Sequence, residues 1–182
     1  TRVKVTRVSG PDGRLILYAS HQSPHALRDA LARQFSLKSE QIRVISADVG
    51  GSFGMKSGLY PEDSLVLVAA RRLGRPVRWV ADRVEGFMTD DHGRDVGIDA
   101  RLALDADGKF LALDVRYLQD VGCYLSGRSH ALVNNIGGIA GVYRIAHIGA
   151  EVRGVFTNTQ TTAPYRGAGR PEATYTIERL VD

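Results

Sequence analysis

The sequence has little cysteine and no long apolar run. Its 182 residues contain a single cysteine, Cys123, which excludes an internal disulfide and a zinc site built from cysteine pairs. A lone cysteine is most often a small buried hydrophobic side chain, so we expect Cys123 to be buried. No apolar stretch approaches the roughly 20 residues that a membrane span needs, and no signal-peptide pattern opens the chain. We therefore expect a cytoplasmic protein without a membrane span.

The sequence also lacks a long run of one charge. The formal net charge is +4, and arginine and lysine are scattered among aspartate and glutamate without interleaved aromatic residues. This pattern does not favour a nucleic-acid partner. Hydrophobic residues make up 43% of the chain and charged residues 24%, which is the balance of a globular protein. The mild positive charge is compatible with an anionic small-molecule cofactor.

Two antiparallel hairpins are predicted by alternating apolar residues, over residues 3–19 and 98–117. Gly10-Pro11-Asp12-Gly13 and Asp105-Ala106-Asp107-Gly108 supply the turn residues. Further strands are expected over residues 42–45, 77–80 and 148–156.

Four helices are expected between these strands and after them. Ser23 is predicted to cap a first helix, and a second begins at Pro61. Residues 65–70 are apolar nearly all round, so the second helix should be buried. Asp82 can cap a short third helix, and Pro171 opens the last. The order of elements predicts an α+β fold, with mixed sheets and antiparallel hairpins packed against helices.

Both ends of the chain resemble cuts through a larger fold. Thr1 is followed at once by a strand pattern, and the helix pattern over residues 171–182 has no C-cap signal. We therefore expect residues 1–182 to be an internal piece of a longer protein. Two sub-lobes are expected within it, over about residues 1–95 and 96–182.

A glycine-rich loop over residues 48–57 can bring backbone N–H groups close to an anion between a strand and a helix. A phosphate-binding P-loop needs glycine directly before its lysine, but Met55 precedes Lys56 here. Glycines that only make a tight turn are the alternative. Phe53 favours a functional loop, because so large a side chain should pack inward or line a pocket.

A second polar loop, over residues 157–172, precedes the last helix. It carries hydroxyls, amides and two arginines, Arg166 and Arg170, whose planar forks of donors fit an oxyanion. Gly167 and Gly169 allow close approach of the backbone. A solvated loop is the alternative interpretation.

Neither loop contains a convincing catalytic group. His21 and His25 are separated by the start of a helix, so a shared metal is not expected. Asp90-Asp91-His92 is expected to form a polar turn, because neighbouring side chains on an extended chain cannot converge on one point.

Together, the two loops resemble the large, molybdopterin-binding subunit of the xanthine dehydrogenase/aldehyde oxidase/carbon monoxide dehydrogenase family, and in particular its aldehyde oxidase-like and carbon monoxide dehydrogenase-like members. The resemblance rests first on the segments 48–56 and 163–172. Segments 22–25, 73–79 and 91–95 support it, in the order that the family has them.

The resemblance implies a molybdenum–pterin cofactor, expected in the cytosine dinucleotide form. Its metal is held through the pterin and not by protein side chains, and it would lie near Phe53, Gly54 and Arg166. The cofactor-binding residues implied are Gly50, Gly51, Ser52, Phe53, Gly54, Arg166 and Gly167.

The implied activity is molybdenum hydroxylase chemistry, in which water supplies the oxygen inserted next to a carbonyl oxygen or a ring nitrogen. The implied partners are the rest of the large subunit, an iron–sulfur subunit and a flavin (FAD) subunit, with a small-molecule substrate. The family's general base is a glutamate near the far end of the subunit, and residues 1–182 have no match to it. No catalytic residue is therefore expected within the chain, which should be inactive alone.

Departures from the family pattern bear on the substrate. Gly167 stands where carbon monoxide dehydrogenases carry a copper-binding cysteine, which disfavours carbon monoxide. Ser57, Asn134 and Ala168 stand where xanthine-type members carry glutamate, arginine and phenylalanine. With Tyr165 they form the expected substrate pocket, suited to an aldehyde or an N-heterocycle. The alternatives are a non-catalytic α+β binding or assembly module and a P-loop-like nucleotide-binding domain.

Overall fold

The computed structural model describes residues 3–7, 13–129, 133 and 135–182. The chain divides into two compact units, residues 1–90 and residues 91–182, and each is described by itself. The elements of the first unit are β1 Val3–Arg7, β2 Leu15–Ala19, α1 Pro24–Gln34, η1 Ser39–Gln41, β3 Ile42–Ile45, η2 Met55–Ser57, α2 Pro61–Leu73, β4 Val77–Val80 and α3 Arg83–Thr89. Those of the second are β5 Val96–Leu104, β6 Phe110–Gly122, η3 Ile136–Gly138, β7 His147–Phe156 and α5 Arg170–Val181.

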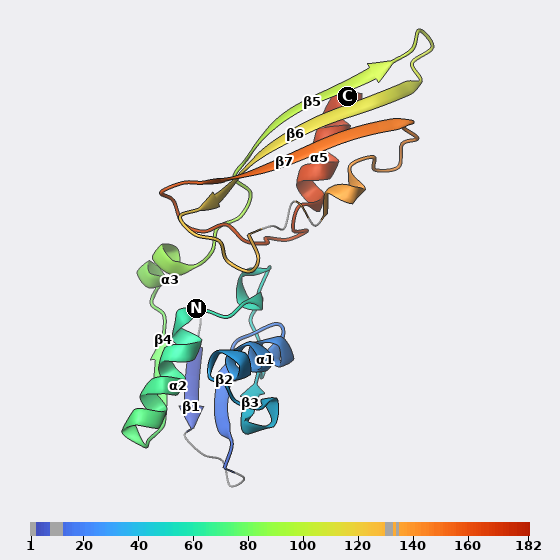
Figure 1. Ribbon diagram of the computed structural model, residues 1–182. Helices are drawn as coiled ribbons and strands as arrows, with labels where there is room; N and C mark the ends of the chain where they lie inside the picture. The colour runs from blue at the N-terminus through green and yellow to red at the C-terminus, as the bar shows by residue number, and fades with distance from the viewer. Residues whose placement is uncertain (1–2, 8–12, 130–132, 134) are drawn as a thin grey trace. The chain divides into compact units, whose positions relative to one another are not determined.

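The first unit is built on a four-stranded sheet in the order β3-β2-β1-β4 (Figure 1). Strand β1 pairs antiparallel with β2 and β4, while β2 pairs parallel with β3. The first predicted hairpin is thus confirmed as a strand pair, although its turn at residues 10–12 lies outside the described part of the chain. The parallel step makes the sheet mixed, as predicted.

The core of this unit lies on one face of β2. Leu15, Leu17 and Ala19 alternate onto that face and pack with residues of α1 and α2, among them Leu27 and Leu67. The two helices therefore cover the same side of the sheet. Burial of α2 all round was wrongly predicted, since Leu65 is 64% exposed. Only one stripe of the helix faces the strands.

The start of α1 differs from the prediction. Ser23 occupies the N-cap position, but its side chain makes no capping hydrogen bond. The backbone N–H of Ser23 instead donates to Nδ1 of the buried His21, 2.9 Å away. Since Nδ1 accepts, Nε2 carries the proton and donates to the carbonyl of Gly58 at 3.2 Å. His21 thus joins the helix start to the far end of the glycine-rich loop.

The second unit is a three-stranded sheet, β5-β6-β7, with α5 packed against one face (Figure 1). Strands β5 and β6 form the predicted antiparallel hairpin, and β6 pairs parallel with β7. Leu113, Val115 and Tyr117 of β6 meet Ile177 of α5 in the core. The α+β class with mixed sheets is confirmed.

Tyr117 fixes α5 to the sheet. Its hydroxyl lies 2.7 Å from Oγ1 of Thr176. Because the Thr176 hydroxyl already donates to the carbonyl of Glu172, 2.8 Å away, Tyr117 is the donor of this bond. Burial raises the pKa of Tyr117, and the Glu172 charge raises it further. The folded protein therefore favours the neutral form of the Tyr117 side chain.

Cys123 is exposed, which corrects the prediction that it is buried. It follows Gly122, the last residue of β6, after an irregularity in the pairing of β6 with β7 between Asp120 and Gly122. Beyond that irregularity the alternation of buried and exposed side chains no longer predicts which way a residue faces.

Candidate functional site

The loop between β3 and α2 is held mainly by its own residues. The N–H of Gly51 donates to the carbonyl of Val49 at 2.8 Å, and that of Met55 to the carbonyl of Ser52 at 3.0 Å. The Ser52 hydroxyl accepts from the N–H of Lys56 at 3.0 Å and donates to the side chain of Gln22. The bonds between residues 49 and 56 close the loop into a series of tight turns, and the bond to Gln22 ties the loop to the chain before α1.

Phe53 lies at the tip of this loop in a left-handed backbone conformation, with φ +56°. Its ring folds back over Gly51. The side chain is 53% exposed, so it does not pack inward within its own unit. Phe53 thus presents an apolar surface at an open glycine turn.

The loop does not run directly into α2. A single 3₁₀ turn, Met55–Ser57, follows Gly54, and α2 begins only at Pro61. The hydroxyl of Ser57 donates back to the carbonyl of Gly54 at 2.6 Å. A P-loop presents its N–H groups together with the start of its helix, so this geometry adds to the sequence argument against one.

The polar loop of the second unit is anchored first at Asp120. Its carboxylate accepts hydrogen bonds from the N–H of Gly122 at 2.7 Å and from the hydroxyls of Thr157 and Thr159 at 2.8 and 2.7 Å. Burial raises the pKa of Asp120, but these donors outweigh it and leave the pKa below its usual range. The backbone carbonyl of Asp120 also accepts from the hydroxyl of Thr162 at 2.7 Å.

The segment at Asp91 and His92 forms a second anchor. The predicted polar turn is wrong at His92, which makes an isolated parallel bridge with Thr162. Its N–H donates to the carbonyl of Thr161 at 2.9 Å, and its carbonyl accepts from the N–H of Ala163 at 2.8 Å. Asp91 forms a largely buried ion pair with Arg128.

Residues 165–169 then form a left-handed turn before α5. Gly167, Ala168 and Gly169 all have positive φ, at +93°, +51° and +97°. The carbonyls of the turn all accept protein donors. Those of residues 165 and 166 accept from Arg94, that of Gly167 accepts from Arg170 at 3.2 Å, and that of Ala168 accepts from Asn135 at 2.5 Å. The acceptors of the turn are therefore used inside the protein.

One backbone donor of the same turn is exposed. Among the described residues, no backbone carbonyl accepts from the N–H of Gly167, which is exposed, or from that of Gly169, which is buried. The Arg166 side chain beside them is exposed. An exposed N–H group beside an exposed arginine suits an oxygen-rich, negatively charged group. The described residues include no group of three histidine, cysteine, aspartate or glutamate side chains placed to hold a metal ion directly.

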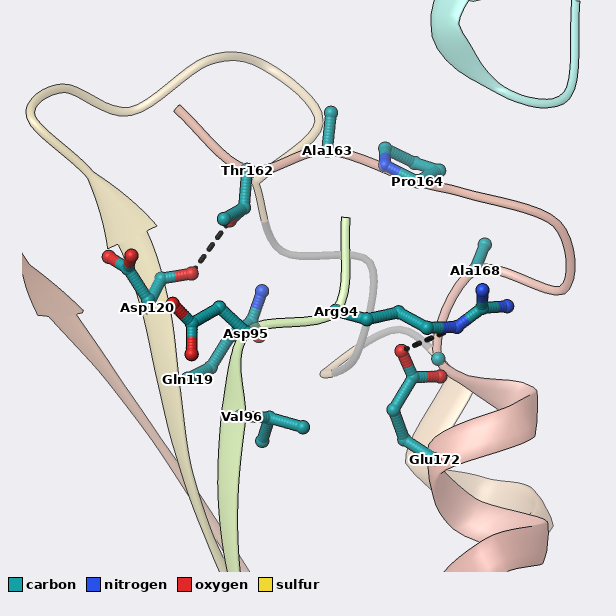
Figure 2. A pocket seen from close by; sticks show the side chains of 11 residues that line it. Arg94, Asp95, Val96, Gln119, Asp120, Thr162, Ala163, Pro164, Ala168 and Glu172 are labelled. Atoms are coloured by element: carbon teal, nitrogen blue, oxygen red, sulfur yellow. Dashed lines mark hydrogen bonds and ion pairs between the residues drawn. The ribbon is translucent and has the colours of Figure 1, made fainter. Parts of the chain in front are cut away.

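A small pocket lies behind this turn, and Figure 2 shows its lining side chains. Arg94 crosses it from the chain entering β5 toward Glu172 in the first turn of α5, and its Nε lies 3.4 Å from Glu172 Oε1. Sequence reasoning missed both residues. Arg94 and Glu172 lie inside segments that carried the resemblance, but nothing in the sequence indicated that they meet. The lining residues are Arg94, Asp95, Val96, Gln119, Asp120, Thr162, Ala163, Pro164, Ala168, Gly169 and Glu172.

The residues expected to bind substrate are distributed over both units. Ser57 belongs to the first unit, while Tyr165 and Ala168 belong to the second. Tyr165 is 45% exposed, and Ala168 lines the small pocket. Asn134 lies outside the described residues. The expected cofactor residues divide in the same way, with residues 50–54 in the first unit and Arg166 and Gly167 in the second.

Comparison with known proteins identifies the class. The family model of the molybdopterin cofactor-binding domain matches residues 1–182. The chain therefore belongs to the molybdopterin cofactor-binding domain family, which confirms the resemblance drawn from the two loops. No described helix is long and apolar enough to cross a membrane.

Particular relatives are subunits of oxidoreductases. The chain is 38% identical over 176 residues to the carbon monoxide dehydrogenase large chain of Hydrogenophaga pseudoflava, covering 93% of this chain and 22% of that one. It is 36% identical over 160 residues to subunit gamma of the 6-hydroxypseudooxynicotine dehydrogenase complex of Paenarthrobacter nicotinovorans, covering 87% and 20%.

A solved oxidoreductase structure contains the same fold. Quinoline 2-oxidoreductase from Pseudomonas putida 86 matches with a TM-score of 0.91 and 36% identity, over 100% of this chain and 24% of that one. The chain thus spans about a fifth to a quarter of the length of these relatives.

Proposed function

We propose that this chain is the cofactor-facing part of the large subunit of a molybdenum hydroxylase, which oxidises an aldehyde or an N-heterocycle with oxygen taken from water. The observation that carries the proposal is the turn at residues 165–169. Its carbonyls are all engaged by the protein, while the N–H of the exposed Gly167 has no backbone acceptor among the described residues and the Arg166 side chain beside it is exposed. This donor set fits an anionic pterin cofactor with oxygen ligands.

The residues have distinct roles in this proposal. Arg166 and Gly167 donate hydrogen bonds to the cofactor from the second unit, and residues 50–54 approach it with backbone and with the exposed ring of Phe53. When bound, the molybdenum–pterin group supplies the two-electron oxidation chemistry. Ser57, Asn134, Tyr165 and Ala168 line the substrate side. The general base lies outside residues 1–182, so this chain binds and orients but does not turn over alone.

The substrate class follows from small side chains and from the relatives. Ala168 and Ser57 leave space where xanthine-type members have larger groups, and Gly167 offers no thiol for copper. Two relatives are named for quinoline and for 6-hydroxypseudooxynicotine. An N-heterocycle is the class that these observations favour most. Iron–sulfur and flavin (FAD) partners, a cytosine dinucleotide form of the cofactor and a cytoplasmic location belong to the same proposal.

Metal and pterin analysis of the intact subunit, expressed with cofactor maturation, tests the proposal. We expect stoichiometric molybdenum with an organic pterin, and reduction of the enzyme by an N-heterocycle. An intact subunit that matures without molybdenum would show a non-catalytic binding module that keeps the fold, and would overturn the proposal.

A further inference from the structure

We infer that Arg94 is a positioning residue that sets the backbone of the turn at residues 165–169. The inference rests on the proposed function, because it assigns to Arg94 the task of presenting Arg166 and its neighbouring N–H groups to the cofactor. Arg94 lies 71 residues before Tyr165 in the sequence, so nothing local holds the two together.

The guanidinium of Arg94 makes four contacts. Nη2 donates to the carbonyl of Tyr165 at 3.3 Å and to that of Arg166. Nε faces Glu172 Oε1 at 3.4 Å, and the guanidinium stacks on the Tyr165 ring with 4.7 Å between its central carbon and the ring centroid. Only a planar fork of donors can serve two carbonyls, a carboxylate and an aromatic face at once.

The ion pair is partly shielded from water. The side chain of Arg94 is 32% exposed, that of Glu172 is 12% exposed, and Glu172 Oε2 is buried without a hydrogen-bond partner among the described residues. Among the described residues, Arg94 is therefore the cation that pairs with the Glu172 carboxylate. Its position in the first turn of α5 ties the start of that helix to the chain entering β5.

The arrangement of the turn explains why it needs this contact. Arg94 and Ala168 both adopt positive φ without being glycine, at +62° and +51°, a conformation that is unfavourable for residues with a Cβ. The bonds from Arg94 direct the carbonyls of residues 165 and 166 into the protein. With these carbonyls bound by Arg94, Arg166 and Gly167 lie on the exposed part of the turn.

Hydrogen exchange of the intact subunit measures this positioning without depending on activity. In Arg94→Gln we expect the amides of Ala168 and Arg170, which close the turn, to exchange about tenfold faster or more. The matched control is Arg101→Gln, since Arg101 is 75% exposed and pairs with Asp99 on the same unit. Unchanged exchange over residues 163–170 in Arg94→Gln would overturn the inference.

Two further variants separate geometry from charge. Arg94→Lys keeps the charge toward Glu172 but lacks the fork, so we expect it to behave like Arg94→Gln. If Arg94→Lys restores slow exchange and full turnover, charge alone suffices and the inference is wrong. Arg94→Gln/Glu172→Gln removes the buried unpaired carboxylate, and we expect its turn to stay fast-exchanging although its stability recovers.

Activity and metal content complete the test. Per bound molybdenum, we expect Arg94→Gln to lower kcat at least tenfold, with a smaller change in KM. A wild-type subunit that holds no molybdenum would overturn the proposed function, whereas the exchange result would still decide whether Arg94 sets the turn.

Discussion

The two glycine-rich loops look alike in sequence but are held in different ways. The loop at residues 50–54 is closed mainly by bonds between residues no more than four apart, such as that from Lys56 N–H to Ser52, with one long-range bond from Ser52 to Gln22. The turn at residues 165–169 depends on Arg94 and Asn135, which lie 71 and 33 residues away from their acceptors Tyr165 and Ala168. We therefore expect substitutions elsewhere in the chain to disturb the turn at residues 165–169 more than the loop at residues 50–54.

The largest effect should come from the exposed arginine of the distantly held turn. Arg166→Ala in the intact enzyme is expected to lower turnover about 100- to 1000-fold, because it removes a charged donor from the developing transition state. Stability should hardly change, since the side chain is exposed. Steady-state kinetics with thermal unfolding in parallel measures both. Unchanged turnover would remove Arg166 from the site.

Alanine at one glycine of each loop compares their tolerance directly. Both Gly51 and Gly167 have positive φ. A Cβ on Gly167 would lie 2.6 Å from the ring of Pro171, which cannot move aside, while a Cβ on Gly51 would meet the end of the Phe53 side chain at 2.8 Å. We expect Gly167→Ala to raise the free energy of the folded turn by about 2–3 kcal/mol and Gly51→Ala by about 1 kcal/mol.

Hydrogen exchange of each loop in the two variants measures this difference. Equal destabilisation of the two loops would contradict the expectation that the turn at residues 165–169 is the less tolerant of the two.

Tyr117→Phe tests how much the contact between β6 and α5 contributes to the stability of the second unit. Removing the hydroxyl that donates to Thr176 should destabilise α5 by about 1 kcal/mol. The pKa of Tyr117 is raised in the folded state, so its contribution is present below the ordinary value near 10 and is lost as pH rises through the folded value.

The wild type should therefore lose stability above pH of about 10, and Tyr117→Phe should lose less. Thermal midpoints measured across this range decide the matter. The same alkaline loss in both proteins would mean that another group is responsible.

Asp120→Asn should have the smallest effect, below about 1 kcal/mol, because the carboxylate is only partly buried and water can replace a lost partner. An amide cannot accept from both Thr159 and the donors on its other atom. The pKa of Asp120 is lowered in the folded state, so its contribution is complete above about pH 4 and is lost as pH falls through the folded value. Exchange of residues 157–162 in the variant and the wild type should therefore converge in acid, and a constant difference would contradict this.

Much of the fold followed from local patterns. Alternation predicted the β5–β6 hairpin, and Asp82 was correctly identified as the cap of α3, where it accepts from the N–H of Glu85 at 2.7 Å. The patterns failed where burial depends on distant neighbours. Leu65 lies on an apolar helix but faces away from the sheet, and Cys123 follows a pairing irregularity.

The sequence by itself determined the family, because the segments 48–56 and 163–172 resemble those of the molybdopterin-binding subunits and the family model matches residues 1–182. Which atoms of the second segment face outward was decided only by the tertiary structure. Arg94 and Asn135 reach the turn from elsewhere in the chain, and hydrogen bonds between residues so far apart leave no periodic signal in a sequence. Distant residues thus occupy the carbonyls of residues 165, 166 and 168, while Arg166 and Gly167 lie on the exposed part of the turn.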